Sequence, residues 1–264
     1  MSQRNEEEQA MLTATRIVHS SLLLDFGGGD RILTDPWFSE KPGYYHGEPL
    51  GMTVGDLPDL SGVVVSHAHY DHYDMNAFSS YRNKKVPFVV KKGTAQPAVN
   101  VGFKNVTELE PWESTMVGNV KVTASPAKHG VPENTYILEC RGQTAFFGGD
   151  TLLIPELEEV ARRFPKIDLA LLPVNGLILR PLLYRRVVMD DTEAAKLCGI
   201  LRPRVAVPTH YAFTAGNLRN HLLLKYTGTA KGFIESVPKY SKTTTAKILD
   251  PGRSVEIEPA SRDE

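Results

Sequence analysis

Gly62 and three β-branched valines at 63–65 lead directly into the string Ser66-His67-Ala68-His69-Tyr70-Asp71-His72, which holds three of the eight histidines of the chain. The run predicts a strand, and a turn at its end would present imidazoles and a carboxylate together. Such nitrogen and oxygen ligands suit zinc, with iron or manganese as alternatives. A solvated loop that is rich in histidine by chance is the competing interpretation, and the regular H-x-H-x-D-H spacing argues against it.

Three later stretches each place one more possible ligand after a predicted strand. His129 follows a strand at 120–124, Asp150 follows 144–147, and His210 follows 204–207. Loops at one edge of a sheet sandwich can converge, because rigid strands fix where each loop begins. The combined set has seven members: His67, His69, Asp71, His72, His129, Asp150 and His210. Seven ligands are too many for one tetrahedral zinc and suit two divalent metal ions that share a carboxylate.

The order of the predicted elements indicates the fold class. Strands dominate the first half of the chain, while the second half alternates strands with helices, one of which starts at a capping box of Asp190 and Glu193. We therefore expect an α/β sandwich of two mixed sheets packed face to face, with helices outside. A single domain is expected over 1–264, with flexible ends at 1–12 and 255–264. Segment 15–26 is predicted to be one extended run, and short strands are predicted from residue 234 onward.

Composition argues against several other classes. The formal net charge of −1 gives no electrostatic footprint for nucleic acid. Because no apolar run approaches the length of a membrane span and the acidic start lacks an apolar leader, we expect no integral membrane segment and a cytoplasmic location. Cys140 and Cys198 each lie in an apolar segment and are predicted to be buried thiols. The sequence leaves the oligomeric state open.

The ordered set of ligand types resembles the metallo-β-lactamase superfamily of binuclear hydrolases, over roughly residues 15–215. The resemblance implies a four-layer αββα fold. It also implies a division of the ligands: His67, His69 and His129 for the first metal, Asp71, His72 and His210 for the second, and Asp150 bridging both.

Within that superfamily, the chain looks most like the branch that contains N-acyl-phosphatidylethanolamine phospholipase D and ascorbate-6-phosphate lactonase. The segments that carry this likeness are His19-Ser20-Ser21, Thr34-Asp35-Pro36, Leu57-Pro58-Asp59, 108–113, 147–151, 168–173 and 208–211. The chain lacks the long N-terminal extension of the phospholipase, and 173–177 match less closely. These departures leave the substrate open, and we expect the loops at 39–59 and 176–189 to decide it.

The leading functional hypothesis is a hydrolase in which a metal-bridging hydroxide cleaves a phosphodiester or ester bond of a small-molecule or lipid-like substrate. Asp71 and Asp150 would be the catalytic carboxylates. The first alternative is a lactonase that opens a phosphosugar or other lactone, and the second is an iron-dependent oxidoreductase on the same fold. A binding module with a vestigial site is disfavoured because all seven ligand types are present.

Three further residues are candidates for supporting roles. Asp35 lies just past a strand end and is predicted to accept a hydrogen bond from a ligand imidazole, although a turn aspartate before proline is the alternative. His19 is a candidate hydrogen-bond donor to substrate or a satisfied strand histidine. Arg180 is a candidate contact for an anionic group, against the commoner case of a surface arginine.

Overall fold

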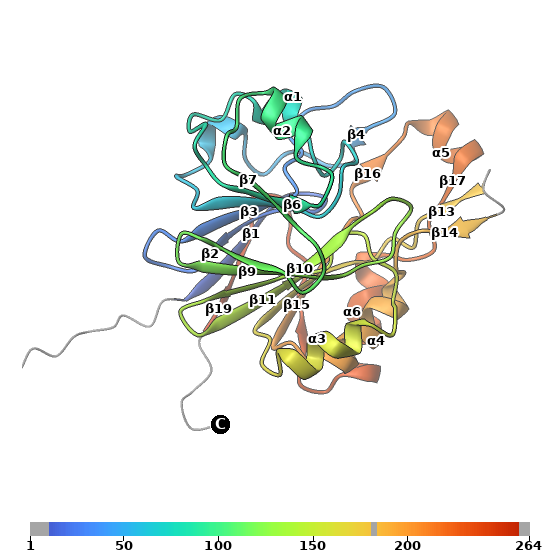
Figure 1. Cartoon of the computed structure of the whole chain (residues 1–264). Helices are drawn as coiled ribbons and strands as arrows, with labels where there is room; N and C mark the ends of the chain where they lie inside the picture. The colour runs from blue at the N-terminus through green and yellow to red at the C-terminus, as the bar shows by residue number, and fades with distance from the viewer. Residues whose placement is uncertain (1–10, 181–183, 259–264) are drawn as a thin grey trace, which may run out of the picture.

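Two seven-stranded mixed sheets pack face to face in the computed structural model, which describes residues 11–180 and 184–258 (Figure 1). The first sheet has the order β19-β1-β2-β3-β5-β6-β7, and the second has the order β18-β15-β12-β11-β10-β9-β8. The first sheet consists of β1 Leu12–Val18, β2 Ser21–Asp25, β3 Arg31–Thr34, β5 Gly62–Val65, β6 Phe88–Lys91, β7 Val106–Leu109 and β19 Ser254–Ile257. The second consists of β8 Ser114–Val117, β9 Val120–Pro126, β10 Asn134–Cys140, β11 Gln143–Phe147, β12 Leu169–Pro173, β15 Val205–Thr209 and β18 Thr245–Ala246.

Each sheet is antiparallel in one half and parallel in the other. In the first sheet the parallel half is β3-β5-β6-β7, and in the second it is β11-β12-β15-β18. Every residue of β5 and of β12 is buried, as expected for parallel strands covered on both faces. Val64, Leu138 and Leu171 belong to the apolar core between the sheets. The carboxyl ends of the parallel strands lie at one edge, and the candidate site begins there.

Helices cover the outer face of each sheet. In Figure 1, α1 (Met75–Phe78) and α2 (Gln96–Asn100) lie over the first sheet, next to the short 3-10 helix η1 (Val54–Asp56). Helices α3 (Leu157–Arg163), α4 (Asp191–Leu201) and α6 (Ala230–Tyr240) lie against the second. The predicted capping box starts α4, because Asp190 Oδ1 accepts the Glu193 amide (2.9 Å) and Glu193 Oε2 accepts the Asp190 amide (3.2 Å). The predicted αββα architecture is confirmed.

Smaller elements extend the body near the candidate site. The two-residue strands β13 (Ile178–Leu179), β14 (Arg185–Arg186) and β17 (Leu224–Lys225) form a separate sheet beside α5 (Asn217–Leu223). Strand β4 (Tyr45–His46) lies within the predicted loop at 39–59 and pairs with β16 (Phe213–Thr214). Among the described residues, no helix combines the length and the apolar character needed to cross a membrane.

Three local predictions are corrected by the structure. Segment 15–26 is two strands, β1 and β2, which turn at His19-Ser20. Of the region from residue 234 onward, β18 and β19 are short strands as predicted, but 230–240 form the helix α6. This helix forms although it contains Gly232 and Pro238, because Phe233 and Val237, four residues apart, bury one face against the second sheet. Of the predicted flexible ends, 1–10 and 259–264 lie outside the described residues, whereas Leu12 pairs with Ile257 between β1 and β19.

Candidate metal centre

Six loops at one end of the sandwich carry the predicted ligands and their neighbours, and each loop starts where a strand ends. The loops after β1, β3, β5, β9, β11 and β15 deliver, in that order, His19, Asp35, the 67–72 string, His129, Asp150 and His210. Backbone hydrogen bonds join the loops of the two sheets, since the Asn134 amide donates to the Ser66 carbonyl (3.1 Å) and the His210 amide donates to the His19 carbonyl (3.4 Å). The strands therefore fix the relative positions of side chains that are far apart in sequence.

Backbone conformation also marks this edge. The φ angles of His19, Asp35 and His210 are 52°, 34° and 58°, in the left-handed region that residues with a Cβ seldom adopt. Such conformations cost about 1–3 kcal/mol each and persist only where the surrounding structure holds them. Three of them among the candidate residues indicate that packing holds this edge in one geometry.

The first group of nitrogens comes from the 67–72 string and from the loop after β9. His67, His69 and His129 offer ring nitrogens that all lie within 4.8 Å of one another. His67 Nε2 lies 2.8 Å from His69 Nδ1, and His129 Nε2 lies 3.4 Å from that same atom. Two ligands of a tetrahedral zinc at about 2.0–2.1 Å stand about 3.3 Å apart, so these separations are close to those of one coordination sphere.

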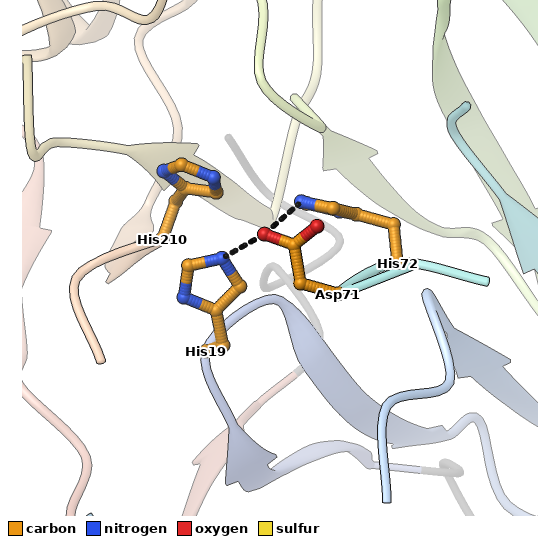
Figure 2. A group of neighbouring side chains, drawn as sticks. All are labelled: His19, Asp71, His72 and His210. Atoms are coloured by element: carbon orange, nitrogen blue, oxygen red, sulfur yellow. Dashed lines mark ion pairs between the residues drawn. The ribbon is translucent and has the colours of Figure 1, made fainter. Parts of the chain in front are cut away.

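The second group gathers around Asp71. Figure 2 shows Asp71 between His19 and His72, with His210 on the far side of His19. Asp71 Oδ2 lies 3.6 Å from His19 Nε2 and 3.7 Å from His72 Nε2, and one atom from each of the four residues falls within 4.8 Å of the others. The structure therefore places His19, which was predicted as a hydrogen-bond donor to substrate or a satisfied strand histidine, within this group of possible ligands.

Asp150 lies between the two groups. Its Oδ2 is 2.8 Å from His210 Nε2 and 3.3 Å from His72 Nε2 in the second group. The same oxygen is 3.8 Å from both His67 Nε2 and His129 Nε2 in the first. A single buried carboxylate oxygen thus faces imidazoles on both sides.

The donor set fits metal cations. His72 Nε2, Asp150 Oδ1 and both ring nitrogens of His19 are buried and find no hydrogen-bond partner among the described residues. Leaving a buried polar atom without a partner costs about 1–3 kcal/mol, so this cluster needs a ligand that accepts nitrogen and oxygen lone pairs. Burial lowers the pKa of His19 to about 3 and that of His129 to about 4, which keeps these rings neutral and able to coordinate.

Asp35 has the position that the sequence predicts for it. Its Oδ2 lies 2.6 Å from His72 Nδ1, and its two oxygens accept the Ser66 amide and hydroxyl at 2.7 Å each. Burial raises the pKa of Asp35, and the neighbouring His72 ring offsets part of that shift. Holding Nδ1–H of His72 fixes the tautomer that presents Nε2 to the second group.

Glu133 is a functional candidate that the sequence reasoning missed. This buried carboxylate has Oε1 3.2 Å from His67 Nδ1 and accepts the Asp150 amide at 2.6 Å. Gly149 makes the approach possible, because its φ is 52° and a Cβ there would collide with Glu133 Oε1 and Ser66. Burial and the nearby Asp150 charge raise the pKa of Glu133 well above its usual range. Glu133 therefore orients one member of the first group together with the residue between the groups.

Arg180 lies outside both groups. Its Nε donates to the Leu224 carbonyl (3.0 Å) within the small β13-β14-β17 sheet. Its predicted role as a substrate contact stays a prediction.

His129 connects the first group to the segment that follows β14, because its Nδ1 donates to the Val187 carbonyl at 2.7 Å. Cys140 and Cys198 are buried free thiols, as predicted.

Replacing Asp35 with asparagine should weaken metal binding, because the amide is uncharged and holds Nδ1–H of His72 less strongly. We expect about 10- to 100-fold lower affinity for the more weakly held zinc, measured by competition with a chromophoric chelator. Asp168→Asn is the matched control, since Asp168 is a buried carboxylate that accepts the Thr144 amide (2.9 Å) at the opposite end of the strands. Equal affinity in Asp35→Asn and Asp168→Asn would contradict the assigned role.

Comparisons with known proteins indicate the same kind of metal-binding site as the geometry. The family described as Beta-lactamase superfamily domain matches residues 30–211. The chain belongs to this family. It is also 27% identical to a protein of Deinococcus radiodurans described as a UPF0173 metal-dependent hydrolase, over 94% of this chain and 100% of that protein. The predicted membership among metallo-β-lactamase superfamily hydrolases is confirmed.

Solved structures share the fold. Igni18, described as a novel metallo hydrolase from Ignicoccus hospitalis, superposes with a TM-score of 0.72 at 21% identity, over 94% of this chain and 99% of that chain. CmlA, described as a diiron beta-hydroxylase from Streptomyces venezuelae, superposes with a TM-score of 0.72 at 17% identity, over 95% of this chain and 54% of that chain. At these identities the likeness establishes the architecture alone.

Proposed function

We propose that this member of the superfamily is a binuclear metal-dependent hydrolase. The position of Asp150 Oδ2 carries the proposal, because this one oxygen is 2.8 Å from His210 Nε2 in one group and 3.8 Å from His129 Nε2 in the other. His67, His69 and His129 would hold one divalent cation. Asp71, His72 and His210 would hold the second, with His19 beside them, and Asp150 would bridge. Zinc suits this set of imidazoles and carboxylates best, with iron or manganese as alternatives.

The two carboxylates have distinct tasks in this proposal. Two bound cations would supply a water of lowered pKa and would polarise an oxygen of the scissile group. Burial works against ionisation of Asp150, but His210 and His72 outweigh it and hold its pKa well below the usual range. Asp150 is therefore an anion at neutral pH and can accept a hydrogen bond from the attacking water, which orients it. Asp71 adds the second negative charge of the site, and its Oδ2 lies between His19 Nε2 (3.6 Å) and His72 Nε2 (3.7 Å).

An aromatic wall beside Asp71 supports a small-molecule or lipid-like substrate. Tyr44, from the 39–59 loop, packs edge to face on Tyr70 (ring centroids 5.5 Å apart) and on Phe213 (5.6 Å). The Phe213 ring in turn lies 6.2 Å from the His19 ring between centroids, so this wall adjoins the second group. Burial raises the pKa of Tyr44, and the charge of Asp71 adds to the shift. A phosphodiester or ester with an apolar substituent suits such a wall, and a lactone is the alternative substrate.

A panel of substrates tests the bond type. Bis(p-nitrophenyl) phosphate, a p-nitrophenyl acyl ester and several lactones would be assayed with the zinc-loaded protein. In Asp71→Ala we expect kcat/KM for the preferred substrate to fall at least about 100-fold, because the second cation loses its own carboxylate. Asp168→Asn should retain the rate. Turnover that is equal in Asp71→Ala and the unchanged protein would show that the proposed site is wrong.

An iron-dependent oxidoreductase is the second candidate, and the fold it shares with the diiron CmlA favours keeping it. The two candidates differ in the metal that the protein retains. About two zinc ions per chain after purification without chelator would support the hydrolase. Iron together with oxygen consumption would support the oxidoreductase, and protein that holds no metal would contradict both.

A further inference from the structure

A protrusion beside the metal centre differs in composition from the rest of the chain. We define it as the described residues of two segments, 177–180 with 184–188, and 213–227, which contain β13, β14, β16, α5 and β17. Figure 1 shows α5, β17, β13 and β14 at the right-hand edge of the molecule, beyond both large sheets. In a chain of net charge −1, these two segments contain no aspartate or glutamate. Their cationic residues are Arg180, Arg185, Arg186, Arg219 and Lys225. The formally charged residues of the protrusion are therefore all cationic.

Large apolar side chains are exposed on the same protrusion. Leu218 and Leu222 are 71% and 57% exposed, and their spacing of four residues places them on one face of α5. Leu223, next to them, is also exposed. Tyr184 on the neighbouring hairpin is 63% exposed. Leu218, Leu222 and Leu223 are the exposed leucines within the described part of the chain. The apolar side chains of α5 therefore have no packing partner, and they lie among the cationic residues of the protrusion.

Charge complementarity limits which kind of partner can bind this surface. A two-fold contact between two copies would set each basic protrusion against itself, and like charges oppose that association. Leucines and a tyrosine flanked by Arg and Lys are the composition of helices and loops that lie in the interface of anionic bilayers, with apolar groups among the acyl chains and cations at the headgroups. We propose that the protrusion docks this protein on the surface of an anionic lipid bilayer.

Docking there would present the metal centre to the bilayer. β16 begins three residues after His210, and the Val187 carbonyl at the root of β14 accepts the hydrogen bond from His129 Nδ1 (2.7 Å). Arg186 is not available for headgroups, because it pairs with Asp190 (2.7 Å) and Glu193 (2.9 Å) at the start of α4. Arg185 and Lys225 are exposed and remain for that contact.

Vesicle co-sedimentation of the full-length, metal-loaded protein tests the proposal. With about 30 mol % phosphatidylglycerol in phosphatidylcholine, we expect binding that declines as salt rises, and weak binding to phosphatidylcholine alone. Leu218→Ser with Leu222→Ser should reduce the partition coefficient at least about tenfold. Arg185→Ser with Lys225→Ser should reduce it by about fivefold per charge on the anionic vesicles alone.

Controls separate docking from folding and from catalysis. Met116→Ser with Ile248→Ser removes two exposed apolar side chains elsewhere and should leave vesicle binding unchanged. Lys104→Ser with Lys166→Ser removes two exposed positive charges elsewhere and should also leave it unchanged. Asp150→Asn should bind vesicles normally, so failure of the proposed hydrolase would not affect this result. Absence of vesicle binding, or equal binding by the leucine variant, would overturn the proposal. Self-association that the leucine variant abolishes, without vesicle binding, would overturn it in favour of a second copy.

Discussion

Asp150→Asn should abolish most of the activity and remove at least one metal ion per chain. We expect kcat/KM to fall by at least about 10³-fold, or about 4 kcal/mol of transition-state stabilisation. The metal content should fall from about two ions per chain to one or fewer, measured by elemental analysis after gel filtration. The reason is that Asp150 Oδ2 faces His210 and His72 on one side and His67 and His129 on the other. An amide of the same size keeps the packing but supplies no charge to either cation.

Asp168→Asn is again the control, because it makes the same chemical change at a buried carboxylate outside the site. Its thermal midpoint can fall, since Asp168 also contacts Arg204, but its metal content and its rate should stay those of the unchanged protein. An Asp150→Asn protein that keeps two metal ions and a near-normal rate would show that this oxygen does not bridge.

The sequence predicts which side chains gather at this edge, because each candidate ligand is local to a strand end. His67 to His72 follow a strand whose β-branched residues mark it clearly, and each later ligand sits just past a similar run. The direction of parallel strands then brings those ends to one edge without further information. Asp35 was predictable for the same reason, since it follows β3 directly.

The features that sequence reasoning missed depend on contacts between segments. Glu133 is one of 31 acidic residues, and only its approach to the Asp150 amide, which Gly149 permits, marks it as special. His19 was a candidate, but the end of its strand was not predicted, because the turn Val18-His19-Ser20-Ser21 contains no glycine, proline, asparagine or aspartate and serine is a weaker turn former. Tertiary contacts impose its left-handed conformation.

The helix α6 shows the same limit in the fold. Gly232 and Pro238 both lower the intrinsic helix propensity of 230–240. The helix nevertheless forms, because Thr229 caps it through the Gly232 amide (2.9 Å) and Phe233 and Val237 are buried in the cluster that includes α4. The apolar area that a segment buries therefore decides its secondary structure more than its intrinsic helix propensity does.

Removal of the metals should inactivate and destabilise the protein together. After dialysis against a chelator we expect less than about 1% of the initial rate, which added zinc should restore. The metal-free protein keeps the buried, unpartnered atoms of His19, His72 and Asp150. A cation present at about 1,000 times its dissociation constant stabilises the fold by about 4 kcal/mol, so loss of one site should lower Tm by roughly 8–16 °C.

Calcium and zinc re-addition would be compared, because calcium takes oxygen ligands whereas this cluster is dominated by imidazole nitrogen. Zinc should raise Tm and restore the rate, and calcium should do neither at the same concentration. In Asp150→Asn the zinc-dependent rise in Tm should shrink by about half or more, since one site or both are lost. If chelation left Tm and activity unchanged while removing all metal, the buried cluster would be structural in its own right, and the proposed metal chemistry would be wrong.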